Sequence, residues 1–168
     1  MLQESLMEKV GLRMKDWVME TGEFLNKGAL VLVGPGHNGG DGLVLARELH
    51  LAGVEVSLWC PFKIKRPLTA KHLSYCISIG ITQLKSEPDA SDQALWIEAL
   101  FGLSQTRSIP KEIGRLLKTR EECMPGHLIS LDVPAGICSE TGKPFEGGSA
   151  KAFATLTVGL IKRGLVQD

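Results

Sequence analysis

The stretch that most constrains the fold runs from Ala29 to Gly53, with the sequence ALVLVGPGHNGGDGLVLARELHLAG. Its first five residues are all apolar and include two valines, which predicts a short buried strand. Five glycines follow within residues 34–42, and a pattern typical of an amphipathic helix then continues to the closing Gly53. A strand, a tight glycine loop and a helix N-terminus form a corner of an α/β sheet, and ligands bind at such corners.

The first three glycines of this loop match the dinucleotide-binding pattern G-x-G-x-x-G. Two features argue against an ordinary dinucleotide site. The predicted second strand, residues 54–60, has its only acidic residue, Glu55, near the start, whereas ribose recognition needs an acid at the end of that strand. In addition, Asp41 places a carboxylate near the helix N-terminus, where a pyrophosphate would otherwise bind.

Asp41 has two interpretations. Alone, it is most simply a helix cap. Together with Asn38, three residues earlier, it provides two oxygen-bearing side chains on a loop that also carries free backbone N–H groups. Such a combination suits a polar ligand, a hard cation or both.

The segment GPGHNGGDG, followed by an amphipathic helix, resembles the signature loop of the YjeF N-terminal domain family, whose enzymes are NAD(P)H-hydrate epimerases. The family usually has Asn where this chain has His37. Residues 6–11 are also similar to a family segment in a helix that packs close to the loop. The resemblance implies that the substrate is bound by five consecutive loop residues: His37, Asn38, Gly39, Gly40 and Asp41.

Length and charge narrow the class of protein. At 168 residues the chain is long enough for one domain with a substantial core, so we expect a single domain over residues 1–168. The 19 basic and 19 acidic residues give no net charge, which argues against nucleic acid or an anionic membrane as partner. No apolar run is long enough to cross a membrane. The 4 cysteines share no C-x-x-C spacing, which is typical of reduced thiols in a cytoplasmic protein.

Periodicity predicts the other elements. We expect helices over residues 3–26, 69–80 and 110–118, and strands over 54–60, 81–84, 95–99, 127–132 and 152–160. With the resemblance, this order predicts an α/β fold: a Rossmann-like, doubly wound, mostly parallel sheet with helices on both faces, in three layers. By comparison with the family, we expect the chain to be shortened at both ends.

Acidic residues lie at the ends of two predicted strands. The first is Glu98, which either faces solvent at the strand end or has a buried role. The matching family segment, D-A-x-x-G, has an Asp that helps to hold potassium, so the resemblance implies this role for Glu98. The next loop matches the part of the family that wraps the substrate's phosphates, and its candidate contacts are Gly102, Leu103, Ser104 and Arg107.

The second acid is Asp132, in the sequence LDVPAG. An Asp before a tight Pro-containing turn can serve the turn alone, but two acids that face one glycine loop favour a site. LDVPAG resembles the family's D-[IV]-P-S-G, whose Asp touches the hydrated nicotinamide, so Asp132 is the candidate for catalysis and substrate binding. Ala135 replaces the family's usual Ser. Lys162, in a segment similar to the family's T-x-T…K, either approaches the ligand or lies in solvent.

The resemblance covers residues 6–162 and implies epimerisation of the R and S forms of NAD(P)HX, the hydrated form of NAD(P)H. Interconversion at the hydrated ring carbon needs proton transfer, or loss and return of water, which is the role we assign to Asp132. The resemblance further implies one potassium ion (K⁺) per subunit, held by Asn38, Glu98 and the Ala135 carbonyl. The expected partners are NADHX or NADPHX as substrate and an ADP-dependent dehydratase domain in a longer parent chain, and a homodimer is left open.

Two other functions are left open by the sequence. A YjeF-like module that binds protein, RNA or a nucleotide without catalysis would explain the departures at His37, Glu98 and Ala135. Retention of Asp132 and of both polar loop side chains argues against that interpretation. An NAD(P)-dependent oxidoreductase is the third alternative, and the missing ribose acid disfavours it.

Overall fold

The computed structural model describes residues 3–166, apart from the Glu23 side chain, so the four terminal residues of the predicted domain lie outside the described residues. Six parallel strands form one sheet in the order β3-β2-β1-β4-β5-β6. Their bounds are β1 (Ala29–Val33), β2 (Val56–Trp59), β3 (Thr82–Leu84), β4 (Leu95–Ala99), β5 (Leu128–Leu131) and β6 (Ala154–Leu156). β1 and β4 are neighbours at the point where the strand order reverses, which is where ligands bind in open α/β sheets.

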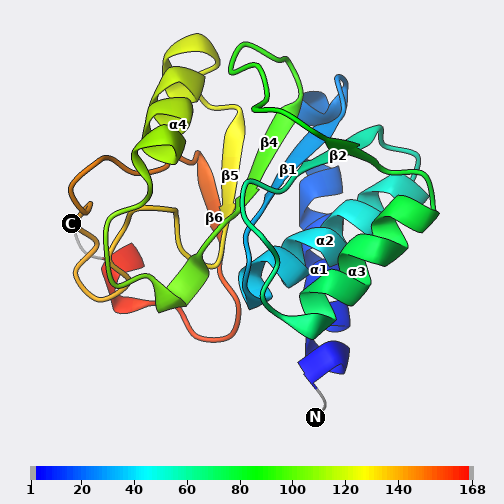
Figure 1. Cartoon of the computed structure of the whole chain (residues 1–168), viewed down its shortest axis with the longest axis horizontal. Helices are drawn as coiled ribbons and strands as arrows, with labels where there is room; N and C mark the ends of the chain where they lie inside the picture. The colour runs from blue at the N-terminus through cyan, green and yellow to red at the C-terminus, as the bar shows by residue number, and fades with distance from the viewer. Residues whose placement is uncertain (1–2, 167–168) are drawn as a thin grey trace.

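Helices cover both faces of the sheet and give three layers (Figure 1). One face carries α1 (Gln3–Glu20), α2 (His37–Leu51) and α3 (Pro67–Ser78), and the other carries α4 (Lys111–Cys123). The short 3₁₀ helices are η1 (Gly22–Leu25), η2 (Gly102–Ser104) and η3 (Arg163–Leu165). The predicted α/β, doubly wound architecture is therefore confirmed. Within residues 3–166, no helix has the length and apolar character that a membrane crossing requires.

The core has two parts, one on each face of the sheet. Alternate residues of β1 supply both, because successive side chains of a strand point to opposite faces. Val31 and Val33 pack in the cluster beneath α1, α2 and α3, whereas Leu30 and Leu32 pack in the cluster beneath α4. All five residues of β1 are buried, which explains why this strand has a continuous apolar sequence.

The glycine segment differs from the prediction. α2 begins at His37, so the loop is confined to residues 34–36, and Asp41 lies in the second helical turn and is not a helix cap. The glycines in this part of α2 allow close packing. A Cβ on Gly39 would lie 2.1 Å from the Gly34 carbonyl oxygen, and one on Gly42 would lie 2.6 Å from the Ala99 Cβ. The glycines therefore let α2 approach β1 and β4.

Other predicted bounds also shift. α1 ends at Glu20 and is followed by η1, whereas the prediction continued the helix to residue 26. α4 continues to Cys123, beyond the predicted end at residue 118. β6 spans three residues, against the nine predicted. Its pairing with β5 stops at Leu131 and Leu156, because Asp132 then leaves the extended conformation. Beyond β6, Lys162 donates to Thr157 Oγ1 and to the Val158 carbonyl.

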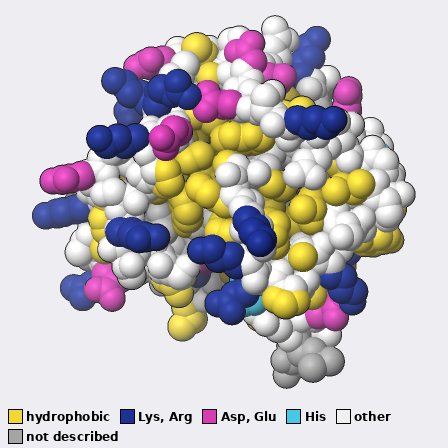
Figure 2. Space-filling view, viewed as in Figure 1, with side chains coloured by type: hydrophobic (Ala, Val, Ile, Leu, Met, Phe, Trp, Pro, Cys, Tyr) yellow, Lys and Arg dark blue, Asp and Glu magenta, His cyan; other side chains and the backbone are white. Residues whose placement is uncertain are grey.

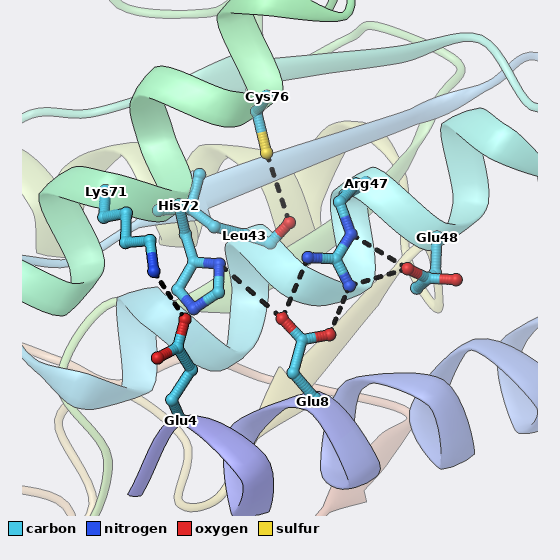
Figure 3. Close-up of polar contacts among 8 residues, drawn as sticks. All are labelled: Glu4, Glu8, Leu43, Arg47, Glu48, Lys71, His72 and Cys76. Carbon is cyan, nitrogen blue, oxygen red and sulfur yellow. Dashed lines mark hydrogen bonds and ion pairs between the residues drawn. The ribbon is translucent and has the colours of Figure 1, made fainter.

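A polar layer joins α1 to α2 and α3 (Figure 3). The Arg47 guanidinium pairs with both carboxylate oxygens of Glu8, at 3.0 and 2.5 Å, and also with Glu48 at 2.7 Å. His72 Nδ1 lies 4.0 Å from Glu8. The helices cross closely beside this layer, because a Cβ on Gly11 would lie 2.3 Å from Val44 Cγ1. A Cβ on Gly40 would likewise lie 2.7 Å from Met7 Cε, so the predicted packing of residues 6–11 against the glycine segment is confirmed.

Candidate active site

The candidate site lies at the carboxyl edge of the sheet, where the chain leaves β1, β4 and β5. The first two turns of α2 bring Asn38 and Asp41 to this edge. Because three residues separate them along a helix, their side chains share a face. The residues that end or follow β4 and β5 lie against the glycine segment, as predicted: Asn38 Nδ2 donates to the Leu131 carbonyl, and a Cβ on Gly102 would lie 3.1 Å from Asn38 Cγ.

Asp132 directly follows β5 in an unusual backbone conformation. It is the one described residue other than glycine with a positive φ, at 66°. This left-handed conformation costs a non-glycine residue about 1 kcal/mol or more and persists only where the surroundings enforce it. Here the Asp132 N–H donates to the Leu156 carbonyl at 2.8 Å, and the Leu103 N–H donates to Asp132 Oδ2 at 2.8 Å. The two bonds fix the carboxylate relative to β6 and η2.

The other carboxylate oxygen of Asp132 pairs with Lys162. Lys162 Nζ lies 2.5 Å from Asp132 Oδ1, and the two side chains are only 10% and 15% exposed. The same ammonium donates to Thr157 Oγ1 at 2.9 Å and to the Val158 carbonyl at 2.6 Å. Lys162 is therefore a buried partner of Asp132. Of the two roles that the sequence left open, solvent exposure is excluded.

Gly102 and Asn38 complete the immediate surroundings of Asp132. A Cβ on Gly102 would lie 3.1 Å from both Asp132 Oδ2 and Asn38 Cγ, and Gly102 has a positive φ of 69°. Both facts require glycine at this position. Asn38 Nδ2 donates to the Leu131 carbonyl at 3.2 Å, whereas Asn38 Oδ1 is buried without a hydrogen-bond partner among the described residues. A ligand or cation at this edge could therefore use that oxygen.

Asp41 and Asp132 form a pair of carboxylates with different surroundings. Burial, and then the negative charge of Asp132, raise the pKa of Asp41 to about 7. Asp41 forms no hydrogen bond or ion pair with another described residue, while Asp132 has both Lys162 and an N–H donor. Two nearby carboxylates in unequal environments can take separate roles, one as a neutral proton donor and one as an anion.

Glu98 is fully buried near the end of β4. Its Oε1 accepts from the Leu100 N–H at 2.8 Å, and its Oε2 accepts from the Ala135 N–H at 3.0 Å. Burial raises the pKa of Glu98 to about 7, against the lowering effect of these two bonds. The Ala135 carbonyl, a predicted potassium ligand, accepts from the Ala150 N–H at 2.7 Å. Glu98 has no cationic partner among the described residues, and Asn38 Oδ1 has no hydrogen-bond partner there. Both are oxygen donors of the kind that hard cations take, and binding of K⁺ by Asn38, Glu98 and the Ala135 carbonyl stays a prediction.

The segment after β4 is anchored by a residue that the sequence did not single out. Gln105 Nε2 donates to the carbonyls of Gly102 and Pro134, at 3.2 and 3.1 Å, and its Oε1 accepts from the Gly136 N–H at 2.6 Å. Gln105 thus ties η2 to the turn after Asp132.

Of the remaining residues predicted to contact the substrate, some line an open cleft and others are packed inside the fold. Ser104 and Arg107 line a cleft of about 850 Å³ next to the Asp132 group, and Arg107 is exposed there. His37 Nδ1 is buried without a partner among the described residues. Gly40 is packed against Met7, because a Cβ on Gly40 would lie 2.8 Å from the Met7 sulfur. Substrate contact by these residues stays a prediction.

Sequence comparison places these features in a known family. The model of the YjeF-related protein N-terminus matches residues 3–164. The bifunctional NAD(P)H-hydrate repair enzyme Nnr of Gloeobacter violaceus is 39% identical over 170 residues, covering 98% of this chain and 33% of that protein. The NAD(P)H-hydrate epimerase of Leuconostoc mesenteroides is 33% identical over 169 residues, covering 100% of this chain and 75% of that protein. The chain thus spans about a third of the bifunctional relative.

Structural comparison agrees on the fold. A yeast protein of known crystal structure superposes with a TM-score of 0.85 at 24% identity, covering 98% of this chain and 74% of that one. This chain has the strand order of a doubly wound sheet, a glycine-rich start of α2 and an acid after β5. Its sequence matches one family model over nearly its whole length. The chain belongs to the YjeF-related N-terminal domain family.

Proposed function

We propose that this chain is an NAD(P)H-hydrate epimerase, which interconverts the R and S forms of NAD(P)HX. The observation that carries the proposal is the Asp132 carboxylate, which is fixed at the sheet edge by Lys162 and by the Leu103 N–H. Relatives with that activity in their names match 96% or more of the chain, which supports the same substrate class.

The chemistry asks for a proton donor and a proton acceptor. The carbon that carries the added hydroxyl is also bonded to the ring nitrogen, whose lone pair can expel the hydroxyl as water once it is protonated. Water then adds to the opposite face of the ring and gives up a proton, so atoms and charge balance over the cycle. Asp132 is the proposed general acid or base. Asp41, whose pKa of about 7 leaves it partly protonated at neutral pH, is suited to hold the second proton.

Other residues would bind and orient the nucleotide. The N-terminus of α2 and the N–H groups of η2 favour the negative charge of the diphosphate, and Arg107 in the adjoining cleft would add a cation. Asn38 Oδ1 and Glu98 would hold K⁺, which would supply positive charge near the ligand. The epimer produced would pass to an ADP-dependent dehydratase, on the same parent chain or a separate one.

The decisive measurement is the rate of R/S-NADHX interconversion by wild type and Asp132→Asn, each with and without potassium. We expect the substitution to lower kcat by about a hundredfold or more, because it removes the group that exchanges protons with the substrate. Asp16→Asn, on the exposed part of α1, is the matched control and should keep the wild-type rate. A wild-type rate in Asp132→Asn would overturn the assignment of Asp132. No rate in folded wild-type protein would favour a binding module.

A further inference from the structure

The cleft beside the candidate site is built from segments far apart in the sequence. One wall comes from the segment after β2, with Phe62, Lys63 and Lys65, and the other comes from the segment after β4, including Arg107. These segments run next to each other at the carboxyl edge of the sheet (Figure 1). The Lys65 N–H donates to the Pro35 carbonyl at 3.0 Å, which fastens the first wall to the loop after β1.

The charge in this cleft is of one sign. Lys63, Lys65 and Arg107 line it, and no acidic side chain does. None of the three cations forms an ion pair within the described part of the chain. In the view of Figure 2, exposed apolar side chains gather near the middle of the face, with Lys and Arg side chains beside them and acidic side chains at their upper border. Since the whole chain has no net charge, this local excess marks a site for an anion.

The end of β2 indicates which anion. In doubly wound folds that bind dinucleotides, an acid after this strand accepts a hydrogen bond from the ribose 2′-hydroxyl, whereas a cation there accommodates a 2′-phosphate. Here β2 ends at Trp59, and the next charged residues are Lys63 and Lys65. An acid would repel a 2′-phosphate and two unpaired lysines would attract it.

The aromatic residues of the cleft suit the other part of the same nucleotide. Phe62 and Phe101 come from opposite walls, and their ring centroids lie 5.6 Å apart at a tilt of 48°. Both rings are partly exposed, so they offer apolar surface to a flat base. Aromatic surface next to cations is the combination expected around an adenosine that carries a phosphate on its ribose.

From these observations we propose that Lys63 and Lys65 bind the 2′-phosphate of the adenosine ribose, so that the protein selects NADPHX over NADHX. This inference rests on the proposed function for the identity of the hydrated substrate. In this proposal the diphosphate, which both substrates carry, would be bound by Arg107, which lines the cleft, and by backbone N–H groups. The two lysines are left for the group that only NADPHX carries.

The test measures binding as well as catalysis. Isothermal titration compares adenosine 2′,5′-bisphosphate with adenosine 5′-phosphate, and kcat/KM is determined for NADPHX and NADHX. We expect wild type to favour the 2′-phosphorylated member of each pair by about tenfold or more, the effect of one charge-assisted hydrogen bond. Lys63→Gln/Lys65→Gln should reduce the preference to near unity by weakening only the 2′-phosphorylated ligand.

Two further variants control for charge and folding. Lys63→Arg/Lys65→Arg keeps the cations and should keep the preference. Lys27→Gln/Lys118→Gln removes the same charge outside the cleft and should leave the preference unchanged. Equal binding of the two adenosine nucleotides by wild type, no binding of either, or an unchanged preference in the Gln variant would each overturn the inference.

The outcomes separate this inference from the proposed function. Epimerisation of NADHX and NADPHX with equal kcat/KM would leave the epimerase proposal standing and remove the 2′-phosphate site. Absence of epimerisation, combined with lysine-dependent selection of the bisphosphate, would remove the epimerase proposal and support the site.

Discussion

The substitution Glu98→Gln measures how much the buried carboxylate lowers the free energy of unfolding when it is charged. Burial raises the pKa of Glu98 from 4.5 to about 7, so the folded chain keeps a proton that the unfolded chain releases. The associated stability is fully present below pH 4.5 and is lost as pH rises to about 7. At about 1.4 kcal/mol per pKa unit, the free energy of unfolding of wild type should fall by roughly 3 kcal/mol across this range from Glu98 alone.

The Gln variant should lose that part of the pH dependence, because an amide does not titrate. Its NH₂ group would also face one of two N–H donors, from Leu100 or Ala135, at a cost of about 1–3 kcal/mol at every pH. The variant should therefore be less stable than wild type at pH 5 and nearly equal to it, or more stable, at pH 8. Urea denaturation at intervals from pH 4.5 to 8, in sodium buffers without potassium, provides the comparison.

Potassium adds a second arm to this experiment. A cation beside the Glu98 carboxylate favours its charged form, so potassium should stabilise wild type above pH 7 more than it stabilises Glu98→Gln. Parallel stability curves for the two proteins between pH 4.5 and 7 would refute the buried-carboxylate reasoning. Equal effects of potassium and sodium on wild type would refute a potassium site at Glu98.

Two other predictions concern cations at opposite edges of the sheet. Lys162→Met removes the partner of the Asp132 carboxylate. We expect the free energy of unfolding, measured by urea denaturation, to fall by about 2 kcal/mol. We also expect kcat to fall by about tenfold or more, with a smaller change in KM. Arg120→Met should cost about 3 kcal/mol or more, because the buried guanidinium donates to the carbonyls before β4 and β5, while kcat per folded molecule stays unchanged. A kcat loss in Arg120→Met, or none in Lys162→Met, would contradict the assignment.

Local sequence patterns located all six strands, although most of them, β6 above all, are shorter than predicted. The predicted strand 95–99 matches β4 residue for residue. The predicted strand 127–132 ended on Asp132, whereas β5 ends at Leu131 and Asp132 directly follows it. The start of α2 was missed because glycines are poor helix formers, so a local pattern assigns them to a loop. In the fold, glycine at Gly39 and Gly42 is required by close contact with β1 and β4, and that tertiary contact outweighs the propensity.

Side-chain partners across the sheet could not be predicted in the same way. Lys162 has no local feature that distinguishes a buried ion pair from a solvated lysine, and it meets Asp132 only because β6 returns beside β5. Gln105 likewise acts through a turn 29 and 31 residues further along the chain. Such pairs join segments that are distant in the sequence, and they can be predicted only when the order of the strands in the sheet is already known.

The features that cost stability are concentrated at one edge of this sheet. The left-handed backbone of Asp132, the carboxyl of Asp41 with its pKa raised to about 7 and the buried Glu98 all lie at the carboxyl ends of β1, β4 and β5. At the opposite edge, the carbonyls before β4 and β5 are satisfied by the buried Arg120. A chain that only had to fold could relieve each of these costs with a hydrophobic or amide side chain of similar size. Strain and unpaired charge placed together, on a scaffold that is otherwise well satisfied, are the expected signature of a site that binds and reacts.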